Sequence, residues 1–121
     1  MATQIRKSRF DLFTKRIIAN EMIELYREVY DDSEVIYYLT SQEQEIADIR
    51  HCARFFLAEK HNVGSSMIAR SESFIWQVLK RGFKKPVNHA TIINSFKVVK
   101  HTLPISRPAF TRRMKNLILG A

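Results

Sequence analysis

The chain has 121 residues, 45% of them apolar, and we expect one folded domain over residues 1–121 rather than a disordered chain. Cys52 is the only cysteine, which excludes a disulfide within the chain and favours a reducing, cytoplasmic location. The first residues, MATQIRKSRF, do not form a secretory signal, and no apolar run approaches the length that spans a bilayer. A membrane partner is therefore not expected.

The formal charge of +8 is distributed unevenly along the sequence. Residues 1–16 hold five basic residues and one acid, residues 17–48 hold one basic residue and nine acids, and residues 49–121 hold fourteen basic residues and two acids. A basic surface set apart from an acidic one favours binding to a polyanion. The alternative is a set of solvated basic faces without a partner.

Nearly the whole chain is predicted to be helical, because it has few glycines and prolines and no Asn-Gly or Asp-Gly hairpin signal. The first helix is expected from Ser8 to Tyr30, and residues 31–33 end it. The stretch SEVIYYLTS that follows fits one or two helical turns or a strand. The first helix is predicted to present one apolar face, formed by Phe10, Phe13, Ile17, Met22, Leu25, Tyr26 and Val29.

A second helix is predicted to open at Ser41, which has capping-box spacing to Gln44, and to end at Asn62 or Gly64 in a left-handed conformation. Its inward residues are expected to be Ile46, Ile49, Ala53, Phe56 and Leu57. The stretch SSMIARSES is expected to be a connector or a single turn. Ser71 or Ser73 would then cap a short helix, Phe74–Arg81, which Gly82 ends.

The last third of the chain predicts two further helices. The first runs from Asn88 to His101 with Ile92, Ile93, Phe96 and Val99 inward, and Pro104 ends it. Pro108 opens the second, in a carboxy-terminal appendage over residues 104–121. One apolar stripe is expected on this last helix, from Phe110, Met114, Leu117 and Ile118.

The helices at 74–81 and 88–101, joined by a glycine-containing connector rich in lysine, have the outline of a helix-turn-helix. In that motif the second helix enters the major groove of DNA and its first residues contact base edges. The candidates for base reading are Asn88, His89, Ala90 and Thr91, and the candidates for phosphate binding nearby are Lys84, Lys85, Lys97 and Lys100. Two alternatives stay open: Asn88 acts only as an N-cap, and His89 is an ordinary surface or half-buried histidine.

The stretch RGFKKPVNHATIINSFKVVK resembles the C-terminal DNA-binding domain of the bacterial chromosomal replication initiator DnaA. Phe83 matches the family's aromatic residue, Lys84 and Lys85 its basic stretch, and residues 88–92 its Asp-His-Thr-Thr-Val pentad. The upstream IRHCARFFLAEKHN is similar to the family's arginine-containing helix. The resemblance covers about Arg50 to Leu103 and implies an all-α, Trp-repressor-like helical bundle that reads double-stranded DNA through the pentad.

The sequence departs from that family in three places. Asn88 replaces the aspartate, Ala90 replaces the first threonine, and the acidic TSQEQEIAD stands where the family has a basic loop. The substitute basic arm is expected in QIRKSRF, with Arg6, Lys7 and Arg9, or in SRPAFTRRMK, with Arg112 and Arg113. No G-x-x-x-x-G-K-[ST] motif is present, so a role in replication would be an accessory one.

No residue pattern favours catalysis, a metal site or a cofactor. The histidines and Cys52 lack metal-ligand spacing, and Cys52 is expected to be a small buried hydrophobe. We expect a double-stranded DNA-binding protein, sequence-specific and nucleoid-associated, acting as a small regulator or accessory factor in replication or transcription and encoded by a phage or mobile element. The alternative is a non-enzymatic structural or adaptor protein that binds a partner, or a second copy, through the acidic first helix or the carboxy-terminal apolar stripe.

Overall fold

The computed structural model describes residues 2–29, 39–78 and 87–120, with side chains from Leu12 onward. Every regular element in these ranges is helical, which confirms the all-α class. The elements are α1 (Ala2–Val29), α3 (Gln44–His61), α4 (Ser65–Val78), α5 (His89–Lys97), the π-helix η1 (Val98–Thr102), α6 (Leu103–Ser106) and α7 (Pro108–Leu119). Among these helices, none combines the length and the apolar character needed to cross a membrane.

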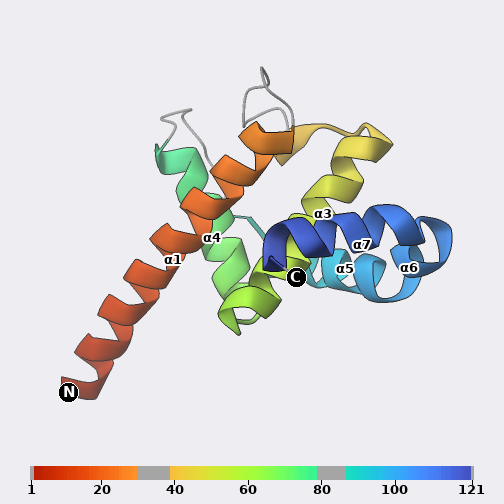
Figure 1. Cartoon of the computed structure of the whole chain (residues 1–121). Helices are drawn as coiled ribbons and strands as arrows, with labels where there is room; N and C mark the ends of the chain where they lie inside the picture. The colour runs from red at the N-terminus through yellow and green to blue at the C-terminus, as the bar shows by residue number, and fades with distance from the viewer. Residues whose placement is uncertain (1, 30–38, 79–86, 121) are drawn as a thin grey trace.

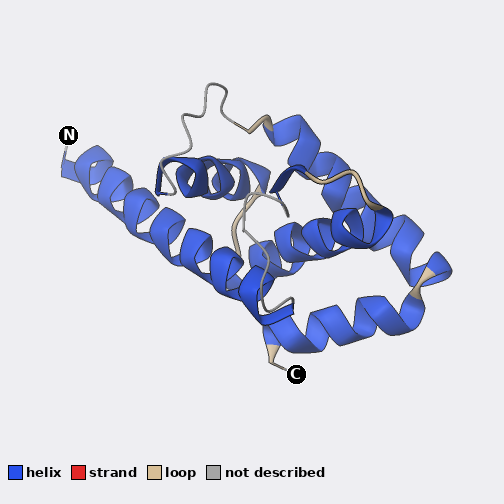
Figure 2. Cartoon of the chain, turned by 90° about the horizontal axis from the view of Figure 1, so that it is seen from above, coloured by secondary structure: helices blue, strands red, loops and turns tan. Residues whose placement is uncertain are grey.

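Helix α3 lies at the centre of the bundle (Figure 1). It packs against α5 and α7 and also contacts α1 and α4, while α1 lies along α4 and α4 packs on α5. The fully buried side chains come from α1, α3, α4 and α5 and belong to one common core; they include Ile18, Met22, Ile49, Leu57, Ile68, Ile75 and Ile92. In both Figure 1 and Figure 2, the amino-terminal half of α1 extends away from the other helices.

Helix α1 buries only the second half of its predicted apolar face. Met22, Leu25 and Tyr26 are buried as expected, whereas Phe13 is 67% exposed. The prediction was wrong for Phe13 because the step from Ile17 to Met22 is five residues, so Phe13 lies on the side of α1 opposite Met22, whereas its neighbour Thr14 is buried. Phe10 lies in the part of α1 whose side chains are not described, and the region between α1 and Leu39 lies outside the described residues.

The predicted capping box at the start of α3 is wrong. The Glu43 backbone N–H donates to Ser41 Oγ at 3.2 Å, so the Ser41 side chain bonds within the segment that precedes α3 and does not cap the helix. Helix α3 begins at Gln44, whose amide donates to Asp48 Oδ1 at 2.8 Å instead of reaching back to the cap. The predicted end is confirmed, since Asn62 has φ 53° and ends the helix in the left-handed conformation.

Helix α4 is continuous from Ser65 to Val78, so the predicted connector and the separate helix from Phe74 were wrong. Ser71 and Ser73 do not cap a helix. Their hydroxyls donate to the carbonyls of Met67 and Ala69 one turn earlier, at 2.8 and 2.9 Å. Side-chain bonds of this kind let serine sit inside a helix when tertiary packing favours one. Gly82 lies outside the described residues.

Pro104 does not end the helical path that begins at α5. The chain passes through the π-helix η1, in which the Leu103 N–H donates to the Val98 carbonyl, and then continues as α6. A proline in an α-helix removes one hydrogen bond and clashes with the carbonyl four residues earlier. Here a wider π turn precedes it, and the chain turns only at Arg107. Pro108 then opens α7, as predicted.

The apolar stripe of α7 is largely buried inside the fold. Phe110, Met114 and Ile118 are buried in the common core against α3, and among the stripe residues Leu117 alone is exposed, at 41%. The stripe is therefore not an open surface for a partner, apart from Leu117.

Candidate nucleic-acid interface

The first turn of α5 faces solvent. The four residues predicted to read DNA bases are all exposed: Asn88, His89, Ala90 and Thr91. Asn88 is also the N-cap of α5, because its Oδ1 accepts a hydrogen bond from the Ala90 N–H at 2.8 Å. The capping interpretation of Asn88 is thus correct, and its side-chain oxygen is already engaged.

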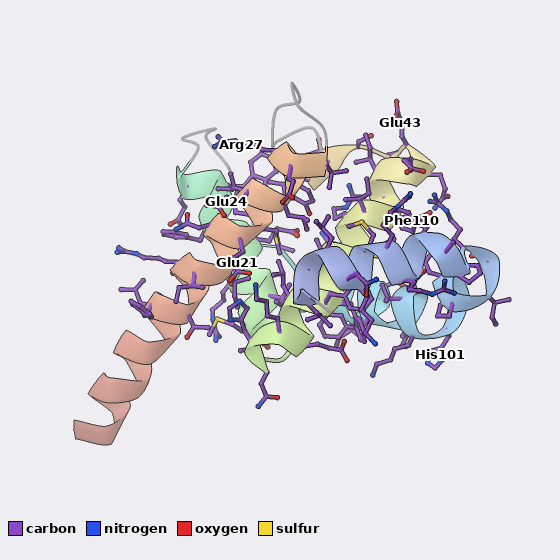
Figure 3. All side chains as sticks on the ribbon, viewed as in Figure 1. Glu21, Glu24, Arg27, Glu43, His101 and Phe110 are labelled. Atoms are coloured by element: carbon purple, nitrogen blue, oxygen red, sulfur yellow. The ribbon has the colours of Figure 1, made fainter. Side chains whose placement is uncertain are left out.

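Helix α5 and η1 together present one exposed face. Ile92, Ser95 and Val99 are buried, whereas His89, Ile93 and Lys97, at four-residue steps, are exposed. Ile93 is 37% exposed, so the prediction that it points inward was wrong. Lys100 and His101 continue the face on η1, and His101 projects away from the helices in Figure 3. The polar first turn therefore belongs to a surface that extends along the whole helix.

Positive charge dominates this end of the chain. No Asp or Glu occurs after Glu72 in the sequence. Lys97 and Lys100 are exposed, and Lys100 Nζ lies 5.8 Å from the centre of the Phe55 ring. Arg107 is different, because it forms ion pairs with the carboxylates of Asp48 at 2.7 Å and Glu45 at 3.0 Å.

The remaining predicted phosphate-binding residues are distributed elsewhere. Arg112 and Arg113 are exposed on α7, which packs on α3 and α6. Lys84 and Lys85 lie outside the described residues, and Arg6, Lys7 and Arg9 belong to the part of α1 whose side chains are not described. Of the cations predicted to accompany the first turn of α5, Lys97 and Lys100 are thus the ones that share its helical path.

A second group of cations lies beside the start of α5, and sequence reasoning missed it. A hollow of about 220 Å³ is bordered by Lys15 of α1, Arg70 of α4 and Val87, the residue before the N-cap. The rest of its lining is Ala69, Ser73, Phe74 and Gln77. Lys15 Nζ lies 5.0 Å from the centre of the Phe74 ring. No sequence signal links residues 15, 70 and 87, because only the packing of α1 on α4 brings them together.

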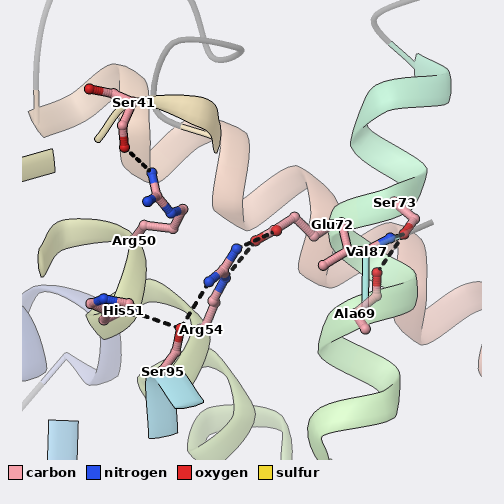
Figure 4. Close-up of polar contacts among 9 residues, drawn as sticks. All are labelled: Ser41, Arg50, His51, Arg54, Ala69, Glu72, Ser73, Val87 and Ser95. Atoms are coloured by element: carbon pink, nitrogen blue, oxygen red, sulfur yellow. Dashed lines mark hydrogen bonds and ion pairs between the residues drawn. The ribbon is translucent and has the colours of Figure 1, made fainter. Parts of the chain in front are cut away.

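Hydrogen bonds to α3 and α4, on the side of α5 that faces the core, hold this helix in position (Figure 4). The Val87 N–H donates to Ser73 Oγ at 2.8 Å, which joins the residue before α5 to α4. Deeper in the fold, Ser95 of α5 lies between two side chains of α3. Arg54 Nη1 donates to Ser95 Oγ at 2.9 Å, and His51 Nδ1 lies 2.7 Å from the same oxygen.

Arg54 also joins α3 to α4. Its Nε and Nη2 donate to the two carboxylate oxygens of Glu72, at 2.9 and 2.6 Å, and both side chains are almost fully buried. Burial, followed by the nearby charges of Arg54 and Arg50, lowers the pKa of His51 to about 4. His51 is therefore neutral at pH 7. The tautomer of His51 sets whether Nδ1 accepts from the Ser95 hydroxyl or donates to it, while Ser95 Oγ accepts from Arg54 in either case.

Cys52 is buried as predicted, and burial raises the pKa of its thiol to about 12, so it stays protonated at neutral pH. Within the described ranges, no three His, Cys, Asp or Glu side chains group in a way that could hold a metal ion. His61 bonds to Glu21 at 2.8 Å instead.

Comparison of the chain with protein-family models, with curated proteins and with solved structures finds no significant match. The resemblance to the DnaA DNA-binding domain and the helix-turn-helix assignment, whose connector lies outside the described residues, therefore stay predictions drawn from the sequence.

Proposed function

We propose that this protein binds double-stranded DNA through the exposed face of α5, and that it acts as a small regulator or accessory factor in replication or transcription. One observation carries the proposal. The first turn of α5 is mostly polar and exposed, although the same helix is anchored by a buried network through Ser95. Rigid presentation of small polar groups is what base reading requires.

The length of the exposed face fits a major groove. Helix α5 and η1 together run from His89 to Thr102, and their amino-terminal residues would contact base edges as in a recognition helix. His89 and Thr91 offer hydrogen-bonding groups, and Ala90 offers a methyl contact to thymine. Asn88 contributes less, because its oxygen caps the helix and only the amide Nδ2 could donate to a base.

Cations on both sides of this first turn would contact the phosphates. Lys97 and Lys100 lie further along the same helical path, and Lys15 and Arg70 border the hollow next to Val87. Contacts of this kind give affinity for any sequence and make binding weaker as salt rises. We therefore assign the role first expected for the amino-terminal arm in part to Lys15, near the middle of α1.

The proposal is tested by measuring the anisotropy of labelled duplexes, first from a random pool and then from sequences selected out of it, at about 50 and 200 mM salt. We expect binding that falls steeply with salt. His89→Ala should reduce discrimination between selected and random duplexes by about 1–3 kcal/mol. Lys15→Ala and Lys97→Ala should weaken all duplexes alike.

Lys115→Ala is the matched control, because Lys115 is an exposed cation on α7 away from α5. It should change affinity less than Lys15→Ala or Lys97→Ala does. Two results would contradict the proposed interface. One is that the chain binds no duplex at the lower salt, and the other is that all the variants bind as Lys115→Ala does.

A second candidate function, that of an adaptor, is favoured by one observation. Leu12 and Phe13 expose apolar surface on the extended half of α1, at 44% and 67%. Exposed apolar residues that lie together commonly mark a protein contact. DNA binding and a protein contact use different surfaces here and are compatible.

A further inference from the structure

In the extended half of α1, Lys15 and Arg16 lie over the Phe74 ring of α4, whereas the side chains of Leu12 and Phe13 remain exposed. Figures 1 and 2 show this half of the helix leading away from the bundle in both views. Leu12 and Phe13 are neighbours on this segment and are 44% and 67% exposed. A helix that leaves an aromatic side chain in water gains stability when another apolar surface covers it.

The other half of α1 borders a groove of opposite charge. A hollow of about 200 Å³ lies between α1, α3 and α7, with apolar walls from Leu25, Leu57, Leu117 and Ile118. Its rim carries Glu21, Glu24, Glu28 and Lys60. Figure 3 labels Glu21 and Glu24 on α1. Glu21 pairs with Lys60 and His61, each at 2.8 Å, so three carboxylates face one lysine and the rim is acidic.

We propose that a second copy of this chain covers both surfaces, with the α1 helices of the two copies packed antiparallel. The amino-terminal half of each α1 would then lie along the acidic groove of the other copy. Leu12 and Phe13 would lie against its apolar walls, where Leu117 is already 41% exposed. The arrangement is a symmetric pair in which one patch meets itself.

Charge complementarity identifies a second copy as the occupant. Within α1, residues 2–16 hold five basic residues and one acid, whereas residues 17–29 hold three acids and Arg27. Antiparallel packing places each basic half against an acidic half, and parallel packing would place like charges together. Complementary potentials of this kind fix the orientation of partners.

The spacing along α1 supports the same register. Phe13, Ile17, Glu21, Glu24 and Glu28 follow one another at three- and four-residue steps, so they share one side of the helix. A two-fold axis through Ile17 puts residue 13 opposite residue 21, and residue 6 opposite residue 28. The helix has 28 residues, about 42 Å, and could pair along most of its length.

The first experiment is sedimentation equilibrium of the full chain without DNA, from micromolar concentrations up to roughly 0.5 mM. We expect reversible dimerisation that weakens with salt. Phe13→Asp should raise the dissociation constant at least about tenfold. Ile105→Asp is the matched control, since Ile105 is 83% exposed but lies on α6, and it should leave the constant unchanged.

The second experiment exchanges charge between the two halves of α1. Glu24→Arg with Glu28→Arg changes the net charge of residues 17–29 from −2 to +2, and Arg6→Glu with Arg9→Glu changes that of residues 2–16 from +4 to zero. Each double variant should be monomeric alone, and an equal mixture should form a one-to-one dimer, which requires both chains to be folded. Glu43→Arg, at an exposed acid before α3, should dimerise as the unmodified chain does.

Two outcomes overturn the proposal. One is an unmodified chain that stays monomeric over the whole range, which would leave this face to a different basic partner. The other is a mixture of the two double variants that forms no dimer. Neither outcome bears on DNA binding, because the measurements contain no DNA.

Discussion

Arg54 and Glu72 form a two-pronged ion pair, with N–O distances of 2.9 and 2.6 Å, in which the side chains are 5% and 3% exposed. This pair connects α3 to α4, and through Ser95 the same guanidinium reaches α5. The face proposed to bind DNA thus depends on a buried charge far from the surface it positions.

Removing Glu72 should destabilise the fold strongly. Glu72→Ala leaves the Arg54 guanidinium buried without its counter-charge, which typically costs about 3–5 kcal/mol of unfolding free energy. Urea denaturation followed by circular dichroism measures this loss. Glu43→Ala, at an exposed position, should stay within about 0.5 kcal/mol of the parent. Similar midpoints for the two variants would show that the ion pair is not buried in solution.

His51 should make stability depend on pH below neutrality. The pKa is about 4 in the folded chain and 6.5 for an ordinary histidine, so the unfolded state binds the proton first as pH falls. The contribution is fully present above about pH 6.5 and is lost between there and pH 4. It amounts to about 2–3 kcal/mol.

Urea midpoints of the parent and of His51→Gln, measured from pH 7 to pH 4, isolate this effect. The variant should lose less stability over that interval than the parent does. His101→Gln is the control, because His101 is exposed on η1, and it should follow the parent curve. Parallel curves for all three proteins would place the His51 side chain in solvent.

Asn88 should contribute to stability as a cap, separately from any contact with DNA. Asn88→Ala removes the bond from the Ala90 N–H and should cost about 0.5–2 kcal/mol, whereas Asn88→Ser keeps an oxygen acceptor and should cost much less. Thermal denaturation compares the two. If duplex discrimination falls equally in both variants while only Asn88→Ala loses stability, the amide Nδ2 reads a base. Equal stability losses would contradict the cap.

Helix α7 should behave as part of the core. Met114 is 3% exposed, and Met114→Ala should cost about 2–5 kcal/mol because it leaves a cavity against α3. Ile105→Ala, at 83% exposure, should change the unfolding free energy by less than about 0.5 kcal/mol. A single unfolding transition is expected in both. A separate early transition in Met114→Ala would instead indicate that residues 104–121 fold as an appendage.

Local signals in the sequence predicted several features correctly. Asn62 ends α3 and Pro108 opens α7, because left-handed backbone and a missing N–H are properties of single residues. The same kind of signal failed at Ser41, Ser71 and Ser73. Serine can cap a helix or bond back to the preceding turn, and its hydroxyl chemistry alone does not distinguish the two.

Hydrophobic spacing also had a limit. It identified the buried residues Met22, Ile92 and Met114, yet it treated Phe13 and Ile93 in the same way although both are exposed. A helical period holds only while the steps stay at three or four residues. In α1 the predicted face contains a five-residue step from Ile17 to Met22, so Phe13 belongs to the side of Glu21 and not to the buried side of Met22.

By itself, the sequence determined the helical class, the separation of acidic and basic segments, and the polar character of the first turn of α5, since these follow from composition and from short-range backbone chemistry. Only the tertiary structure decided that Arg54 is buried against Glu72, that Lys15 and Val87 border the same hollow, and that α4 is unbroken. These features join residues far apart in the chain, and their energy comes from burial and from hydrogen bonds that exist only once the helices have packed.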